Sequence, residues 1–200
     1  DIGSGCVLDT TKHQLGPEPM PQDSIKAGVG LCFFSGDKLL GGPQSGIIAG
    51  KKEYVDRVRS HPLARAFRIN KASLASLHTT MLHYIKNEAL QKIPTWIMIS
   101  ESNDNLRTRA ELIKSKVGKS FIIVESQSTI GGGSLPEQTL LSTAISIKCD
   151  SPNSLTKALR QAKNPVIARI ENNQVFIDLR TVLPEEDHNL TRTLIDTIPT

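Results

Sequence analysis

One lysine of this sequence stands where a side-chain amine could act as a nucleophile. Lys38 lies in the stretch Ser35-Gly-Asp-Lys-Leu-Leu-Gly-Gly-Pro-Gln-Ser-Gly46, directly after Asp37. Short apolar runs flank this stretch at 29–34 and 46–50. A lysine delivered from a strand end into a glycine-rich turn can lose part of its hydration, which favours the neutral amine that attacks a carbonyl. The pattern predicts a Schiff-base lysine, and the alternative is an ordinary surface lysine in a turn.

A phosphate-binding loop is the other chemistry that a lysine beside glycines could serve. In that motif the glycines come before the lysine, and Ser or Thr follows it. Here Leu39 follows Lys38, and Gly41 and Gly42 come after it. This order excludes the phosphate-loop motif.

Two arginines form a second candidate site. In Ser60-His-Pro-Leu-Ala-Arg-Ala-Phe-Arg68, Pro62 suits the first position of a helix. Arg65 and Arg68 are three residues apart and would share one face of that helix. Two guanidinium groups directed to one point would bind an oxyanion. The alternative is that both arginines form salt bridges with neighbouring acidic residues.

The elements around these residues follow from the apolar pattern. Residues 29–34 and 46–50 are apolar on both faces, so we expect two short buried strands. Residues 51–59 fit an amphipathic helix, and Asn70 suits the N-cap of a longer one. We expect the apolar positions of this longer helix, and His78 among them, to pack in the core. The apolar positions are Leu74, Leu77, Met81, Leu82 and Ile85.

From about residue 90 the pattern changes to mixed strands and helices. Three consecutive glycines near residue 132 predict a mobile loop, and Glu171-Asn-Asn173 predicts a hairpin turn between two strands. A last helix closes the chain. The mixture predicts a small α+β domain. Its other predicted elements are a helix at 104–117, strands at 120–125 and 143–149, and a helix at 152–161.

Composition narrows the class of protein. The net charge is +4, and the segment 51–71 alone holds seven basic and two acidic residues, so the rest of the chain is nearly neutral. The three cysteines lack metal-ligand spacing, so we expect no metal site and a reducing compartment. The sequence has no apolar stretch of the ~20 residues that a membrane span needs, so we expect no membrane partner. The first residue is Asp1 rather than Met, which suggests a fragment.

Several strings resemble one family. Asp1-Ile-Gly-Ser-Gly5, Phe34–Gln44 and His61–Arg68 closely resemble motifs of bacterial selenocysteine synthase (L-seryl-tRNA(Sec) selenium transferase), and Gly131–Pro136 and Asp178–Thr181 do so more weakly. The resemblance implies an α/β protein with the PLP-dependent transferase fold, which is aspartate-aminotransferase-like (fold type I). It implies that residues 1–90 are the C-terminal part of the large domain, which binds pyridoxal 5'-phosphate (PLP). Residues 91–200 would be the small C-terminal α+β domain.

The resemblance also implies roles for the candidate residues. Lys38 would hold PLP as a Schiff base and later remove the α-proton of the substrate. Asp1 would pair with the pyridine nitrogen, which keeps the ring able to accept electrons. Ser35 would contact the cofactor phosphate, or would only cap the turn. Asp37 would carry a proton to the leaving hydroxyl or adjust the basicity of the lysine.

The implied reaction converts seryl-tRNA(Sec) to selenocysteinyl-tRNA(Sec) through an aminoacrylyl intermediate. Arg65 and Arg68 would hold the selenium donor, selenophosphate. The family implies a cytoplasmic homo-oligomer built from dimers. Because the upstream half of such a protein would carry further cofactor contacts and a tRNA-reading domain, we expect this chain alone to bind PLP poorly and to lack turnover.

Two alternatives compete with this interpretation. A PLP-dependent β-lyase or aldolase would act on a free amino acid and need no tRNA. A non-catalytic module would bind RNA through the basic segment 51–71, in a salt-sensitive way that does not depend on Lys38.

Overall fold

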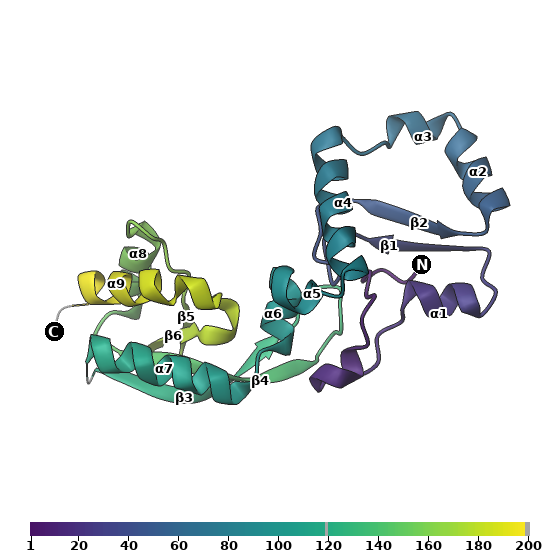
Figure 1. Ribbon diagram of the computed structural model, residues 1–200. Coiled ribbons are helices and arrows are strands. Elements are labelled where there is room, and N and C mark those ends of the chain that lie inside the picture. The colour runs from purple at the N-terminus through teal and green to yellow at the C-terminus, as the bar shows by residue number, and fades with distance from the viewer. Residues whose placement is uncertain (119, 199–200) are drawn as a thin grey trace. The chain divides into compact units, whose positions relative to one another are not determined.

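A computed structural model describes residues 1–118 and 120–198. The chain forms two compact units (Figure 1). The first contains Asp1–Ile97 and Thr129–Gln138, and the second contains Met98–Ser128 and the chain from Thr139 onward.

The first unit consists of a short β-hairpin and a series of helices. Its strands β1 (Leu31–Ser35) and β2 (Gly46–Gly50) pair antiparallel. The other elements, in chain order, are η1 (Thr10–His13), α1 (Pro21–Lys26), α2 (Lys52–Ser60), α3 (Leu63–Ala66), α4 (Lys71–Ile85), α5 (Ala89–Lys92) and α6 (Pro94–Ser100), whose last residues belong to the second unit.

The hairpin corrects the predicted burial of its strands. Both predicted strands exist, but in β1 buried and exposed residues alternate, and Phe33 is 40% exposed between buried Cys32 and Phe34. In β2 no residue is fully buried. The expectation of burial on both faces was wrong, because this two-stranded ribbon has only one well-covered face in the described parts of the chain.

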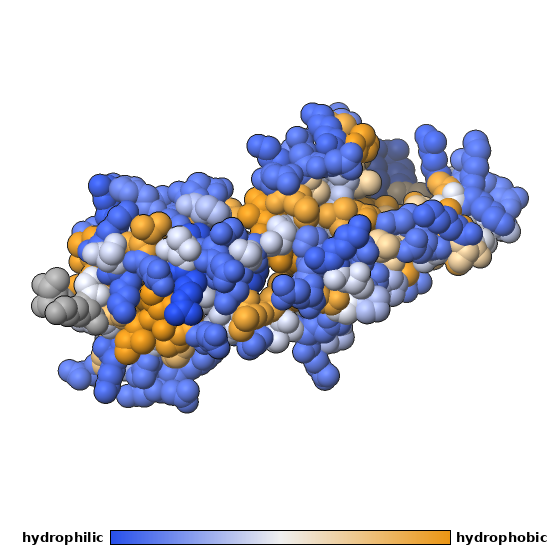
Figure 2. Space-filling model, turned by 60° about the horizontal axis from the view of Figure 1, so that its bottom comes forward, coloured by the Kyte–Doolittle hydropathy of each residue, from blue (hydrophilic) through white to orange (hydrophobic). Residues whose placement is uncertain are grey.

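Helix α4 begins where the sequence predicted, but several of the apolar side chains expected in the core are exposed. The Asn70 side chain accepts a hydrogen bond from the Ser73 backbone N–H at 2.9 Å, which confirms the N-cap. However, Leu74 is 56% exposed and Ile85 73% exposed, and His78 is exposed as well. The prediction that this stripe packs in the core was wrong, because little of the described chain covers it. Apolar residues also reach the surface in the view of Figure 2, as orange patches among polar residues.

The core of the first unit holds the residues that follow Lys38. Leu39 and Leu40 are buried together with Trp96. The Tyr84 hydroxyl donates to the Leu40 carbonyl at 2.8 Å and accepts from the Trp96 indole N–H at 2.7 Å. Burial raises the pKa of Tyr84 well above its usual value, so the hydroxyl keeps its proton for this bond. The chain next to the lysine is therefore firmly held.

In its described residues, the second unit contains a four-stranded sheet in the strand order β3-β4-β6-β5, together with the helices α7, α8 and α9 (Figure 1). Strand β6 pairs antiparallel with both β4 and β5. Asn172 and Asn173, both at positive φ, form the predicted hairpin turn between β5 and β6. The elements are α7 (Asn103–Val117), β3 (Phe121–Thr129), β4 (Thr139–Lys148), α8 (Pro152–Gln161), β5 (Arg169–Glu171), β6 (Gln174–Asp178), η2 (Leu179–Thr181), η3 (Pro184–Glu186) and α9 (Asp187–Thr197).

Buried side chains from the sheet and all three helices form one core in this unit. They include Leu106 of α7, Ile145 of β4, Leu159 of α8, Val175 of β6 and Leu194 of α9. The predicted helices at 104–117 and 152–161 and the predicted mixture of strands and helices are confirmed.

A buried polar network joins the strands of this unit. The Asp178 carboxylate accepts hydrogen bonds from the hydroxyls of Ser128 at 2.7 Å and Ser142 at 2.6 Å. Arg180 donates to three backbone carbonyls, those of Met98, Glu101 and Leu141. These contacts give Asp178 and Arg180 structural roles within the unit.

Within the described residues, no helix is both long and apolar enough to cross a membrane. The same residues contain no group of three or more His, Cys, Asp or Glu side chains arranged to hold a metal ion.

Candidate active site

The turn that carries Lys38 is closed by its own backbone. The Gly36 N–H donates to the Ser45 carbonyl at 2.9 Å, and the Gly42 N–H donates to the Gly36 carbonyl at 2.8 Å. The Gly41 N–H donates to the Lys38 carbonyl at 2.9 Å. Gly41 has φ +70, and a Cβ there would lie 2.3 Å from the Ile93 side chain, so this position requires glycine. The turn therefore presents its lysine on a fixed backbone.

The first residues of the chain lie along the end of β1. Gly3 forms a parallel bridge with Phe34, and its carbonyl accepts a hydrogen bond from the Ser35 N–H at 3.1 Å. A Cβ on Gly3 would lie 4.0 Å from the Lys38 amine nitrogen. Gly5 lies close to the Ser35 backbone, since a Cβ on Gly5 would lie 2.2 Å from the Ser35 carbonyl oxygen. The glycines thus allow this segment to pass directly beside β1 and the lysine.

Asp1 and Ser35 are brought to the same end of β1. The Asp1 carboxylate accepts a hydrogen bond from the Gly3 N–H at 2.9 Å. Ser35, half-buried, lines the same groove as Asp1. Asp37, in contrast, is exposed, and in the described residues it makes no ion pair with Lys38. The structure therefore places Asp1 and Ser35 on one groove, which Lys38 does not line, and it leaves Asp37 exposed.

A residue that the sequence did not indicate lies against the lysine. A Cβ on Gly133 would lie 3.2 Å from the Lys38 amine nitrogen and 3.5 Å from its Cε. Gly133 belongs to Thr129–Gln138, which is part of the first unit. The three glycines predicted only a mobile loop here, and their spacing gave no sign of the partner, Lys38, which is 95 positions away in the sequence.

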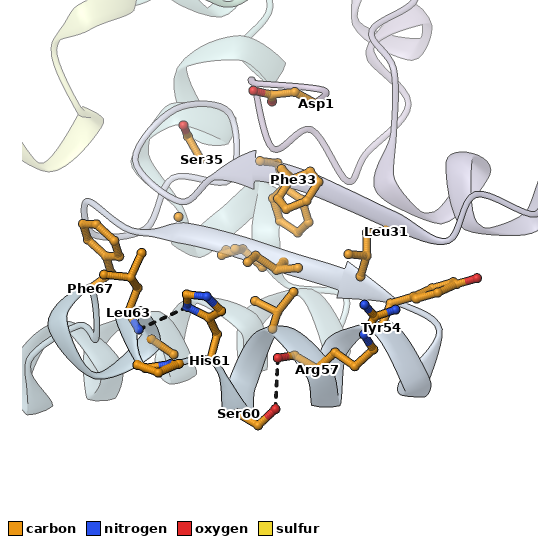
Figure 3. A pocket seen from close by; sticks show the side chains of 17 residues that line it. Asp1, Leu31, Phe33, Ser35, Tyr54, Arg57, Ser60, His61, Leu63 and Phe67 are labelled. Atoms are coloured by element: carbon orange, nitrogen blue, oxygen red, sulfur yellow. Dashed lines mark hydrogen bonds between the residues drawn. The ribbon is translucent and has the colours of Figure 1, made fainter.

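A groove of about 1260 Å³ opens beside the hairpin (Figure 3). The hairpin contributes Phe33, and the α2–α3 region contributes Arg57, His61 and Leu63. The His61 Nδ1 accepts a hydrogen bond from the Leu63 N–H at 3.2 Å, which fixes the ring at the edge of the groove. Lys38 does not line this groove. The groove and the amine are thus separate features.

The two arginines of the proposed clamp are placed differently from the prediction. Helix α3 has only four residues and ends at Ala66, with Phe67 as its C-cap, so Arg68 lies outside it. The argument that Arg65 and Arg68 share one helix face was wrong for this reason. Both arginines are exposed, and neither forms an ion pair with any residue that the structure describes, so the salt-bridge alternative has no support there.

Comparison with solved structures shows the fold. The chain is similar to D-glucosaminate-6-phosphate ammonia-lyase, with a TM-score of 0.54 and 17% identity, over 86% of this chain and 44% of that one. This likeness supports the predicted fold class, α/β with the aspartate-aminotransferase-like fold.

The sequence comparisons give the family. The profile described as L-seryl-tRNA selenium transferase matches residues 1–183. Among curated proteins, the L-seryl-tRNA(Sec) selenium transferase of Alkaliphilus oremlandii is 43% identical over 194 residues, which are 93% of this chain and 42% of that protein. The protein of the same name from Carboxydothermus hydrogenoformans is also 43% identical, over 93% of this chain and 41% of its own length. The chain belongs to the L-seryl-tRNA selenium transferase family, as the motifs predicted, and it spans about two fifths of the length of these relatives.

Proposed function

We propose that the whole protein to which this chain contributes converts seryl-tRNA(Sec) to selenocysteinyl-tRNA(Sec), with PLP as cofactor and selenophosphate as selenium donor. The family match supports this activity. The observation that carries it is the position of Lys38, whose amine lies beside two glycines, on a turn that its own backbone closes.

The residues at the end of β1 fit PLP. Lys38 offers the amine for covalent attachment, Asp1 offers a carboxylate for the ring nitrogen, and Ser35 offers a hydroxyl for the phosphate. The Gly3 N–H donates to the Asp1 carboxylate and the Gly3 carbonyl accepts from the Ser35 N–H, so a ligand would meet Asp1 and Ser35 as one surface. When bound, PLP supplies an electron sink that stabilises negative charge at the α-carbon of the amino acid.

Two residues would move protons in this reaction. Lys38 would hold PLP, and its amine nitrogen, when free, would take the α-proton of the seryl group. Asp37 would return a proton to the departing hydroxyl; its exposure leaves the carboxylate free to face a substrate. The Asp37→Asn variant should keep PLP attached at Lys38 and lose turnover, and unchanged turnover would remove Asp37 from the mechanism.

Arg65 and Arg68 would bind the selenophosphate anion. Both are exposed and unpaired within the described chain, so their donors are available to an oxyanion. Replacing either by alanine should raise the KM for selenophosphate and leave the KM for seryl-tRNA near its original value. Arg59→Ala, an exposed arginine on α2, is the matched control and should change neither constant.

The test of the function uses a protein of the relatives' length that contains this chain. It is incubated with PLP, radiolabelled seryl-tRNA(Sec) and selenophosphate, and the amino acid is released and separated. We expect selenocysteine to form, Lys38→Ala to abolish it, and Lys86→Ala, an exposed lysine after α4, to leave it intact. Activity on free serine or cysteine derivatives instead would favour the β-lyase or aldolase alternative. Salt-sensitive RNA binding without turnover, indifferent to Lys38, would favour the binding-module alternative.

The remaining parts of the proposal concern the whole protein. We propose a cytoplasmic homo-oligomer built from dimers. Residues 1–90 would be the C-terminal part of the large domain, which binds PLP. Residues 91–200 would form the small C-terminal α+β domain. These assignments stay predictions, and size measurement by light scattering tests the oligomer.

A further inference from the structure

The Lys38 amine lies against a glycine from a distant part of the chain. The position of a Cβ on Gly133 is 3.2 Å from the amine nitrogen and 3.5 Å from Cε. A contact of 3.2 Å is closer than most Cβ contacts in proteins, so an added methyl group would displace the end of the lysine side chain or the loop. Gly133 also has φ +81, which L-residues other than glycine rarely adopt.

The loop that brings Gly133 to the lysine is anchored after its glycines. Leu135 is only 2% exposed. The Gln138 side-chain oxygen accepts a hydrogen bond from the Gly16 N–H at 2.6 Å, and the Gln138 N–H donates to the Leu135 carbonyl at 3.2 Å. The buried leucine and these bonds hold the C-terminal half of the loop in the first unit. The position of Gly133 is therefore set by packing that does not involve the lysine.

The three consecutive glycines differ in what a side chain would meet. A Cβ on Gly131 or on Gly132 has nothing within 4 Å. Gly131 has φ +138, in the region that disfavours side chains, whereas Gly132 does not lie in that region. Of these three glycines, only Gly133 combines a positive φ with a close approach to another residue, and that residue is Lys38. Gly131→Ala is therefore a control for backbone strain, and Gly132→Ala is a control for the addition of a methyl group alone.

We propose that Gly133 is a positioning residue for Lys38. The Gly133 backbone packs against the end of the Lys38 side chain, and the absence of a side chain there leaves room for the amine. This packing determines the position of the amine. The proposal rests on the proposed role of Lys38 as the amine that carries PLP. A side chain at this position would turn the amine away from the cofactor, although Gly133 itself makes no chemical contribution.

The experiment compares Gly131→Ala, Gly132→Ala and Gly133→Ala in a protein of the relatives' length that contains this chain. Each variant is titrated with PLP, reduced with borohydride and digested, and the labelled fraction of the Lys38 peptide is measured by mass spectrometry. We expect Gly133→Ala to need at least tenfold more PLP for half-maximal labelling. Gly132→Ala should stay within twofold of the original protein, and Gly131→Ala should show only the smaller effect of backbone strain.

A second readout separates positioning from general damage. The absorbance of PLP bound at Lys38 is followed against pH, and Gly133→Ala should shift the midpoint because the amine lies in a new environment. Unfolding by urea is then measured for Gly133→Ala with and without Lys38→Ala. If the methyl group acts through the lysine, its effect on stability is smaller when the lysine is absent.

The outcomes separate this inference from the proposed function. If Lys38 is not labelled in the unaltered protein, the proposed function itself fails. If Lys38 is labelled equally in all three variants, with the same pH midpoint, the function stands and the positioning role is refuted. An equal effect of Gly133→Ala on stability with and without Lys38 would also refute it.

Discussion

Replacing Arg180 by methionine should destabilise the second unit strongly. Arg180 is 6% exposed, and its guanidinium donates to three backbone carbonyls. One terminal nitrogen reaches Met98 at 2.7 Å and Glu101 at 2.8 Å, and the other reaches Leu141 at 2.7 Å. Methionine keeps most of the aliphatic length but removes every donor. Three backbone carbonyls then lose this donor.

The expected magnitude follows from these three bonds. Hydrogen bonds to a charged group contribute about 1.5–3 kcal/mol each. Part of that sum is offset, because the variant no longer buries a charge, and the same burial lowers the pKa of Arg180 in the native protein. We expect a net loss of about 3–5 kcal/mol in the free energy of unfolding.

The assay is urea denaturation followed by far-ultraviolet circular dichroism. Arg160→Met is the matched control, because Arg160 is exposed on α8 in the same unit. This variant should change the free energy of unfolding by no more than about 0.5 kcal/mol. A loss below about 1 kcal/mol for Arg180→Met would refute the reasoning, since at least one carbonyl would then have found another donor.

Three further changes test single contacts of the first unit. Tyr84→Phe removes the hydroxyl that joins Leu40 to Trp96, so urea denaturation should show a loss of about 1–3 kcal/mol in the free energy of unfolding. An unchanged midpoint would contradict the stabilising role of the two hydrogen bonds. Ser134→Ala removes a buried hydroxyl that has no partner among the described residues, so it should be neutral or stabilising by the same assay; a clear loss would reveal a partner. Burial lowers the pKa of His13, so the unfolded chain binds a proton more readily than the folded one. Stability should therefore fall as pH drops through about 6.5, and His13→Gln should weaken this dependence; an identical pH profile would refute it.

Local signals in the sequence predicted the elements well. Asn70 was recognised as a helix start because capping depends only on neighbouring residues. The turn at Asn172 and Asn173 was found for the same reason, since few residues accept a positive φ. The string around Lys38 was specific enough to give the family as well.

Burial and long-range contacts were harder to predict. The apolar run of β1 suggested burial on both faces, but whether Phe33 is covered depends on what packs there, which a local pattern does not contain. Arg68 was placed on a helix because Pro62 can start one, but nothing in the spacing showed that α3 stops after four residues. The approach of Gly133 to Lys38 joins segments 95 positions apart in the sequence, and only the folded chain reveals it.

The most direct test of the account is the identity of the residue that carries PLP. A protein of the relatives' length that contains this chain is loaded with PLP, reduced with borohydride and mapped by mass spectrometry. We predict that the label lies on the peptide containing Lys38 and disappears in Lys38→Ala. A label on another lysine, or none at all, would contradict it and leave Lys38 as a lysine of structural importance only.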